Sequence, residues 1–185
     1  MTFLELALHG SYIVTTEVKE DERGWFGRTY CKNEFVAIGH ISEWVQINHS
    51  FTIKAGTIRG LHYQVPPFSE IKLVRCIRGK VYDTIVDLRE NSPTFLQSVG
   101  VELSEENRKS IYIPAGMAHG FQSLADNSEL IYHHSAIYKP GYERGIRYDD
   151  PVLGIRWPMP VGVVSQRDLD HPLLEINFKG IKIVA

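Results

Sequence analysis

The sequence of 185 residues contains only two cysteines, Cys31 and Cys76, and their spacing matches neither a metal-binding motif nor a disulfide framework. No apolar run approaches the roughly 20 residues that a membrane-spanning helix needs. The first nine residues include Glu5 but no lysine or arginine, unlike a signal peptide. We therefore expect a cytoplasmic protein with two free thiols and no membrane partner.

The chain also lacks an excess of either charge. Its 20 basic and 22 acidic side chains give a net charge of −2, and the isoelectric point is about 6.4. Without a broad basic surface, nonspecific binding to nucleic acid or to an anionic membrane is not expected. A local basic pocket for a small anion is compatible with this balance.

Helical periodicity is scarce, and alternation of apolar and polar residues with a period of two dominates. The pattern predicts a single all-β domain over residues 1–185, a double-sheet jelly roll or barrel with few short helices. A β-sandwich without an interior site fits the strands equally well, and polar residues inside the strands argue weakly against it. The expected strands cover 13–18, 72–77, 81–88, 98–103, 110–113, 121–124, 129–137 and 176–184, and the expected helical segments cover 31–38 and 104–108.

Two expected strands carry polar side chains on an otherwise apolar face. On a strand, Lys72 shares its face with Val74 and Cys76, and Tyr132 shares its face with His134. A buried ammonium needs an anionic or carbonyl partner, because burial lowers a lysine pKa. The alternative is that Lys72 extends along the rim of the sheet and keeps its charge in water.

The histidines point to proton transfer rather than to metal binding. Metal-binding jelly rolls of the cupin type combine a His-x-His pair and a following Glu with a Pro-x-Gly-x-x-His motif. The second motif is present and ends at His119, but His-Tyr-Gln at 62–64 stands in place of the first. A histidine without a metal can act as a general base if a carboxylate orients it. The sequence leaves Asp83, Asp87 and Asp168 open for that task, and each can equally be a cap, a turn residue or a satisfied strand residue.

From about residue 21 to about residue 172, a series of motifs resembles the dTDP-4-dehydrorhamnose 3,5-epimerase family. The order and spacing of these motifs are specific to that family. They include Gln-Ile-Asn-His-Ser at 46–50, Arg-Gly-Leu-His-Tyr-Gln at 59–64, Lys-Leu-Val-Arg at 72–75, Ile-Pro-Ala-Gly-Met-Ala-His-Gly-Phe at 113–121 and Gly-Ile-Arg-Trp-Pro at 154–158.

The resemblance implies a metal-free, cupin-like jelly roll that forms a homodimer. It also implies inversion at C3, C5 or both of a nucleotide-linked 4-keto-6-deoxy-hexose, with dTDP-4-dehydro-6-deoxy-glucose as the leading substrate. By the same resemblance His62 removes the proton, Asp168 orients His62, Lys72 stabilises the enolate and Tyr132 returns a proton from the opposite face. No cofactor is expected, because the substrate carbonyl is the electron sink.

The substrate-binding positions are likewise transferred from the family. They match polar or aromatic residues that hold the diphosphate, the base or the sugar, and arginine suits phosphate because its planar group donates two hydrogen bonds. Part of this set is expected to come from the neighbouring subunit. The positions are Arg23, Phe26, Arg28, Gln46, Asn48, Arg59, His119, Tyr138, Glu143 and Arg167.

The chain departs from the family pattern in several places. Arg28 stands where many members carry Glu, His133 follows Tyr132 where Lys is common, and Arg167 replaces a Lys. These changes leave open an epimerase that acts at one carbon, on a dTDP- or CDP-sugar. The other readings are a nucleotide-sugar 3,4-ketoisomerase, a non-catalytic sugar-nucleotide binding module and, least favoured, a metal-dependent cupin oxygenase.

Overall fold

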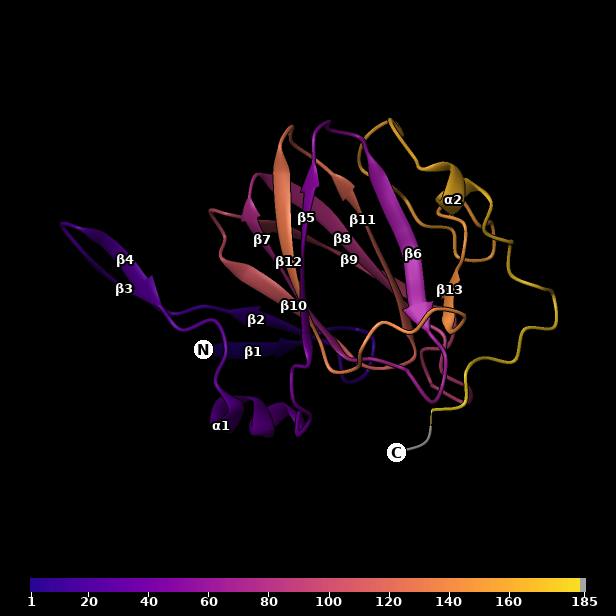
Figure 1. Ribbon diagram of the computed structural model, residues 1–185, viewed down its shortest axis with the longest axis horizontal. Helices are drawn as coiled ribbons and strands as arrows, with labels where there is room; N and C mark the ends of the chain where they lie inside the picture. The colour runs from indigo at the N-terminus through magenta and orange to yellow at the C-terminus, as the bar shows by residue number, and fades with distance from the viewer. Residues whose placement is uncertain (184–185) are drawn as a thin grey trace.

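The computed structural model describes residues 1–183, and two antiparallel β-sheets face each other as a jelly roll (Figure 1). One sheet has six strands and the other has five. The first sheet has the order β1 (Thr2–Glu5), β2 (Tyr12–Thr15), β10 (Lys109–Ile113), β7 (Lys72–Arg78), β12 (Ser128–His134) and β5 (Gln46–Thr52). The second has the order β13 (Glu143–Gly145), β6 (Ile58–Gln64), β11 (Met117–Ser123), β8 (Lys80–Asp87) and β9 (Ser98–Ser104). The predicted all-β fold class is confirmed.

The remaining elements lie outside these two layers. A hairpin of β3 (Val18–Asp21) and β4 (Gly24–Gly27) projects from the body in Figure 1. The short helices are α1 (Lys32–Phe35), η1 (Val36–Ile38) and α2 (Gln166–Leu169). Among residues 1–183 no helix has the length and apolar character to cross a membrane.

The main core fills the space between the sheets. Val74 and Cys76 of β7 and Leu130 of β12 pack with Ile85 of β8 and Phe121 of β11, and all five are buried. Along β7 both faces are covered: Val74 and Cys76 point into this core, and Leu73 is buried on the opposite face. A second cluster of buried aromatic and apolar side chains covers the outer face of the six-stranded sheet, where Phe35, Leu73 and Tyr112 meet.

Most strand predictions are confirmed, with shifted ends. The predictions over 72–77, 81–88, 98–103 and 110–113 correspond to β7, β8, β9 and β10. The helical segment predicted over 31–38 is present as α1 and η1. By contrast, the single strand predicted over 13–18 is interrupted between β2 and β3, and the one predicted over 129–137 ends at His134.

Two element predictions are wrong. Residues 104–108 form a hydrogen-bonded turn rather than helix, in which Ser104 and Asn107 bond each other's backbone amides. The strand predicted over 176–184 is absent among its described residues, where Ile181 makes an isolated bridge to Arg89. Val184 lies outside the described residues.

Candidate active site

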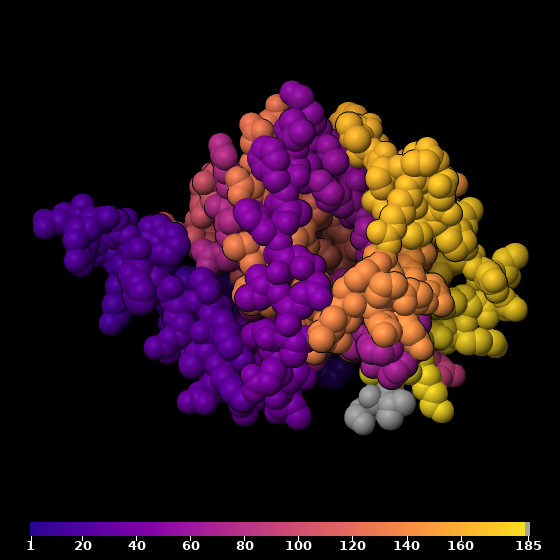
Figure 2. Space-filling view, in the orientation of Figure 1, coloured from indigo at the N-terminus to yellow at the C-terminus, as the bar shows by residue number. Residues whose placement is uncertain are grey.

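A cavity of about 800 Å³ lies between the two sheets, bordered by β5, β7 and β12 of one sheet, β6, β11 and β13 of the other, and the C-terminal segment. In Figure 2 the surface is hollowed between β5 on one side and that C-terminal segment, drawn in yellow, on the other. All four predicted catalytic residues line this cavity: His62, Lys72, Tyr132 and Asp168.

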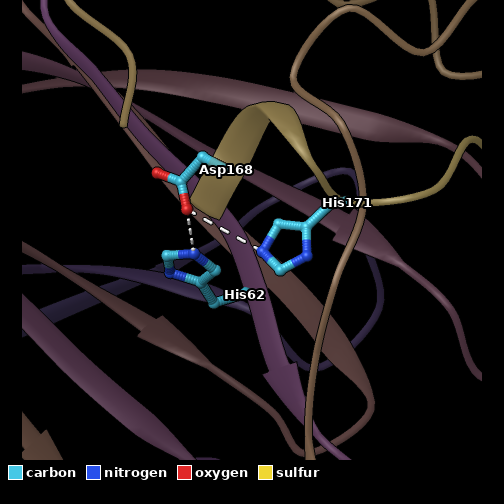
Figure 3. Close-up of side chains that lie close together, drawn as sticks. All are labelled: His62, Asp168 and His171. Atoms are coloured by element: carbon cyan, nitrogen blue, oxygen red, sulfur yellow. Dashed lines mark hydrogen bonds and ion pairs between the residues drawn. The ribbon is translucent and has the colours of Figure 1, made fainter. Parts of the chain in front are cut away.

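The best-defined contact in the cavity joins His62 of β6 to Asp168 of α2 (Figure 3). Nε2 of His62 donates to Oδ1 of Asp168 at 2.7 Å. The backbone amide of Gly60 donates to the other carboxylate oxygen at 3.2 Å, and the side chain of Ser165 caps α2 by accepting from the Asp168 amide. Burial alone would raise the pKa of Asp168, but the hydrogen bond and charge of His62 outweigh it and hold that pKa below its usual value.

Gly60 allows β6 to approach β11 closely. Its φ is +109°, and a Cβ at this position would lie 2.7 Å from both Cα of Gly120 and the carbonyl oxygen of His119. Any larger residue would push the strand that carries His62 away from its neighbour. The glycine in the Arg-Gly-Leu-His motif is therefore required by backbone packing.

A third side chain, His171, completes this cluster and was not predicted from the sequence. Its ring meets the ring of His62 edge-on at 5.5 Å, and its Nε2 lies 3.8 Å from Oδ1 of Asp168. A Cβ on Gly145 would come within 2.1 Å of the His171 ring, so the glycine makes room for it. Nothing in the spacing of His171 from the motifs signals this position.

The cluster also has the composition of a metal site, since ligand atoms of His62, Asp168 and His171 all lie within 4.8 Å of one another. The separation of 2.7 Å between His62 and Asp168 argues for a shared proton. Two atoms that bind one zinc ion, each about 2.0–2.2 Å from it in tetrahedral geometry, lie farther apart than that. The geometry is that of a hydrogen-bonded acid–base pair.

Lys72 is buried on the inner face of β7, as its alternation with Val74 and Cys76 predicted, and does not extend along the rim. Nζ lies 3.2 Å from Oε1 of Glu70 and donates a long hydrogen bond of 3.5 Å to the carbonyl oxygen of His62. The anionic partner that a buried ammonium needs is thus supplied by Glu70, which the sequence reasoning did not single out.

Tyr132 occupies the six-stranded sheet, whereas His62 occupies the five-stranded one. The phenol oxygen lies 2.9 Å from the hydroxyl of Ser50, and burial raises its pKa well above the usual value. The phenol is therefore protonated near neutral pH, so a proton is present to be donated. The imidazole and the phenol therefore reach one cavity from opposing sheets.

The other two carboxylates that the sequence left open have different partners. Asp83 is fully buried and accepts from Nε2 of His119 at 2.9 Å. Asp87 binds the guanidinium of Arg89 and the hydroxyls of a nearby turn, and despite its burial these contacts lower its pKa to about 2. Of the three carboxylates, Asp168 is the one that contacts His62, as the resemblance implied.

The predicted substrate-binding residues divide into two groups. Seven of them line the cavity with the catalytic residues: Gln46, Asn48, Arg59, His119, Tyr138, Glu143 and Arg167. At one end, Arg167 forms an ion pair with Glu143, and the hydroxyl of Tyr138 donates to the same carboxylate at 3.1 Å. An arginine, a carboxylate and a half-exposed aromatic ring thus lie together.

The other three, Arg23, Phe26 and Arg28, are not brought to the cavity of their own chain. They lie on or beside the projecting β3–β4 hairpin (Figure 1). Arg23 pairs with Asp21, Arg28 pairs with Glu34, and the side chain of Phe26 is exposed. Because the hairpin extends away from the sheets, these three residues do not reach the cavity of their own chain, and their contact with a substrate stays a prediction.

The chain was compared with known proteins. The family model for dTDP-4-dehydrorhamnose 3,5-epimerase matches residues 5–175. The chain is 41% identical over 171 residues to the dTDP-4-dehydrorhamnose 3,5-epimerase of Shigella flexneri, which covers 92% of this chain and 94% of the relative.

Solved structures give the same result. The epimerase of Bacillus anthracis str. Ames, with TDP and PPi bound, superposes with a TM-score of 0.91 at 35% identity, covering 94% of this chain and 99% of that one. A dTDP-6-deoxy-D-glucose-3,5-epimerase of Legionella pneumophila Philadelphia 1, in complex with dTDP-4-keto-L-rhamnose, superposes with a TM-score of 0.91 at 34% identity, covering 100% and 99%.

Proposed function

The chain belongs to the dTDP-4-dehydrorhamnose 3,5-epimerase family, and on that premise we propose how its own residues perform the reaction. It is an isomerase that inverts carbon centres of a nucleotide-linked 4-keto-6-deoxy-hexose, with the dTDP-linked sugar as the leading substrate. In this proposal His62 is the base, Asp168 orients it, Lys72 stabilises the enolate and Tyr132 is the acid.

The reaction begins when the neutral imidazole of His62 removes a proton from a carbon next to the ketone. Asp168 holds the ring in one tautomer and stabilises the imidazolium that forms, which its hydrogen bond of 2.7 Å allows. The electron pair left on carbon moves into the carbonyl, and the developing oxyanion meets the ammonium of Lys72. The substrate's own carbonyl is thus the electron sink.

Inversion then requires that a proton return from the other side of the ring. Tyr132 donates it. The phenolate that results then takes up a proton from solvent, and the imidazolium of His62 releases the abstracted proton to solvent. One observation carries the proposal: His62 and Tyr132 enter one cavity from opposing sheets, and Lys72 lines the same cavity. A base and an acid on the same wall would return the proton to the face it left.

The nucleotide is assigned to cavity residues other than the catalytic four. Arg59 and Arg167 offer guanidinium groups for the diphosphate, and Tyr138 offers a ring on which a base can stack. The structure of the Bacillus anthracis relative holds TDP and PPi, which supports a site with this chemistry. The sugar is assigned to the remaining polar residues, Gln46, Asn48 and His119.

We propose a homodimer in which the β3–β4 hairpin reaches the cavity of the second subunit. Trp25 and Phe26 on strand β4 of the hairpin are exposed, Phe26 by 78%, and edge strand β5 exposes Ile47 and Phe51. Apolar side chains on a projecting hairpin and along a sheet edge favour pairing with another copy. Arg23, Phe26 and Arg28 would then contact the partner's substrate.

Subunit mixing tests this arrangement. His62→Ala and Phe26→Ala chains, each nearly inactive alone, should together recover about a quarter of the wild-type rate, because mixed dimers restore one site in two. A chain with both substitutions, mixed with either single variant, is the control and should recover nothing. Absence of recovery, with mixed dimers present by light scattering and mass spectrometry, would refute the shared site.

The chemistry is tested by solvent exchange. Offered dTDP-, CDP- and GDP-linked 4-keto-6-deoxy-hexoses in deuterated water, the wild type should label C3, C5 or both, and NMR of the product gives the regiochemistry. His62→Ala and Asp168→Asn should incorporate no label at the same protein concentration. Full labelling by both variants would overturn the assignments, and a carbonyl moved to C3 would indicate a ketoisomerase instead.

A further inference from the structure

Glu70 and His134 line the cavity beside Lys72, yet the mechanism above gives neither of them a role. Both side chains are about nine-tenths buried. The carboxylate of Glu70 lies 3.2 Å from Nζ of Lys72 through one oxygen and 2.7 Å from Nδ1 of His134 through the other. A carboxylate thus bridges an imidazole and the ammonium that meets the enolate.

The contacts of His134 on its other side fix its tautomer. The amide nitrogen of Asn48 lies 3.3 Å from Nε2 of His134, and as a donor it requires Nε2 to accept. His134 therefore carries its proton on Nδ1 and donates it to Glu70. The chain of bonds continues outward, because Gln46 donates to Asn48 at 3.1 Å and accepts from the Tyr138 amide at 3.0 Å.

We propose that Glu70 and His134 are positioning residues for the epimerase reaction: together they hold the Lys72 ammonium, charged and correctly placed, against the carbonyl oxygen of the substrate. The inference rests on the proposed function, in which Lys72 stabilises the enolate. It adds a line of side chains, Asn48–His134–Glu70–Lys72, that links the wall assigned to substrate binding with the group that meets the oxyanion.

Glu70 maintains the positive charge of Lys72. Burial in a cavity wall favours the neutral amine of a lysine, and an amine stabilises an oxyanion far less than a cation does. Burial would by itself raise the pKa of Glu70, but the hydrogen bond from His134 and the charge of Lys72 outweigh it and keep that pKa lowered. Glu70 therefore remains an anion and keeps its neighbour a cation.

Glu70 also fixes the orientation of the Lys72 ammonium. An ammonium has three donors on a flexible stem. One points to Glu70, a second makes the long contact with the carbonyl oxygen of His62, and the third is free to meet a substrate oxygen. Without Glu70 the stem loses its only short contact among the described residues, and the third donor loses its direction.

A purely structural ion pair would predict lower stability without a change in the pH dependence of turnover. The positioning role predicts such a change, because removal of the Glu70 carboxylate charge favours the neutral amine at this buried position. The other ionisable groups on the cavity wall, which stay in place, are His49 on β5, Arg59, His62 and Tyr63 on β6, His119 on β11, Tyr132 and His134 on β12, Glu143 on β13, Arg167 and Asp168 on α2, and Tyr138.

The first experiment compares Glu70→Gln with the wild type by steady-state kinetics and deuterium incorporation across pH. We expect kcat to fall about ten- to a hundredfold, the worth of a hydrogen bond to a charged group, with KM little changed. The alkaline limb of the kcat profile should move to lower pH. Unchanged kcat and an unmoved alkaline limb would overturn the proposal.

The second experiment uses His134, so that the result does not depend on one variant. His134→Leu removes the donor to Glu70 and should lower kcat about tenfold. His134→Asn places an amide near the position of Nδ1 and should recover most of that loss. His133→Asn, on the opposite face of the same strand, is the matched control and should leave kcat unchanged. Equal kcat in the Leu and Asn variants would contradict the role of this hydrogen bond.

Lys72→Met distinguishes failure of the proposed function from failure of the positioning role of Glu70 and His134. If it retains full deuterium exchange, the role of Lys72 in the proposed function fails, and the inference fails with it. If it abolishes exchange while Glu70→Gln and His134→Leu do not reduce it, the epimerase assignment stands and the inference alone fails. Thermal unfolding and calorimetric binding of dTDP verify that each variant is folded.

Discussion

Two neighbouring residues on β12 occupy opposite environments, and the contrast extends over the whole molecule. His134 faces the cavity and binds a carboxylate, as do His62 and His119. His133 faces the outer aromatic cluster, where its ring meets Trp44, and the pKa of this histidine is lowered by burial. A buried imidazole with an anionic partner can accept a proton, and one among aromatic rings is held neutral.

The outer cluster contains a second histidine of the same kind. His40 is fully buried, stacks on Trp44 at 4.3 Å and lies 3.3 Å from the hydroxyl of Tyr112, and burial lowers its pKa. The two faces of the six-stranded sheet therefore differ: the inner face presents Lys72, Tyr132 and His134 to the cavity, and the outer face is packed with aromatic and apolar side chains. His171 is the exception, since it lies beside the His62–Asp168 pair, yet burial lowers its pKa and its Nε2 lacks a hydrogen bond among the described residues.

The largest loss of activity is expected when the anionic partner of a cavity histidine is removed. Asp168→Asn leaves His62 with a neutral neighbour, so the imidazolium formed during proton abstraction is no longer stabilised. We expect kcat to fall by on the order of 10³-fold, within the usual range for general acid–base catalysis. Steady-state kinetics measure this loss, and the fold is monitored by circular dichroism. A loss of less than fivefold would show that Asp168 does not orient the base.

The outer cluster should respond to truncation through stability rather than activity. Phe35 is fully buried and packs against four rings: Phe3, Tyr30, His40 and Tyr112. Phe35→Ala should lower the free energy of unfolding by about 3–5 kcal/mol. Urea unfolding measures this change, while kcat below the unfolding transition should stay close to that of the wild type. A variant with unchanged stability and low kcat would reverse the assignment of the two faces.

The histidines of the outer cluster should also give the stability of the protein a specific dependence on pH. His40 and His133 have folded-state pKa values below the unfolded value of about 6.5. Their contribution is complete above pH 6.5 and is lost as the pH falls from there towards the lower folded values, because the unfolded state binds more protons. A His40→Phe, His133→Phe double variant should show a flatter profile of urea midpoints between about pH 7.5 and about pH 5.5.

The carboxylates provide the internal control for that experiment. The pKa values of Glu70 and Asp168 are lowered, so their contribution is present above the unfolded pKa values near 4 and is lost below them. This acid loss should remain in the double variant. If the profile is unchanged between neutral and mildly acidic pH, the outer histidines do not stay neutral in the fold.

The smallest expected effect concerns Cys76, which shares the inner face of β7 with Lys72 but has no charged partner. Burial raises the pKa of its thiol to about 12, so almost no thiolate is present near neutral pH. Iodoacetamide should modify the half-buried Cys31 of the native protein and leave Cys76 unmodified, and mass spectrometry of peptides locates the label. Both thiols should react after unfolding. Equal native rates would contradict the burial of Cys76.

Local patterns correctly predicted the strands that run through the core. Strands β7 and β8 each have one or both faces in the core, and their apolar content predicted them. Edge strand β5 was missed, because its Gln-Ile-Asn-His-Ser-Phe-Thr sequence mixes polar residues with apolar ones that stay exposed. The pattern predicts a strand over 176–184 for the converse reason, since apolar residues such as Phe178 and Ile181 pack against the core without forming a strand of either sheet.

The sequence by itself determined the family, the jelly-roll class and the four proposed catalytic residues, including Asp168 as the partner of His62, because these depend on short motifs and on strand periodicity. Only the tertiary structure decided that Glu70, 64 residues from His134 in the chain, serves that histidine and Lys72. A pairing between side chains so far apart leaves no trace in local spacing. It exists because two sheets close over one cavity and bury these groups together, where each charge requires a partner.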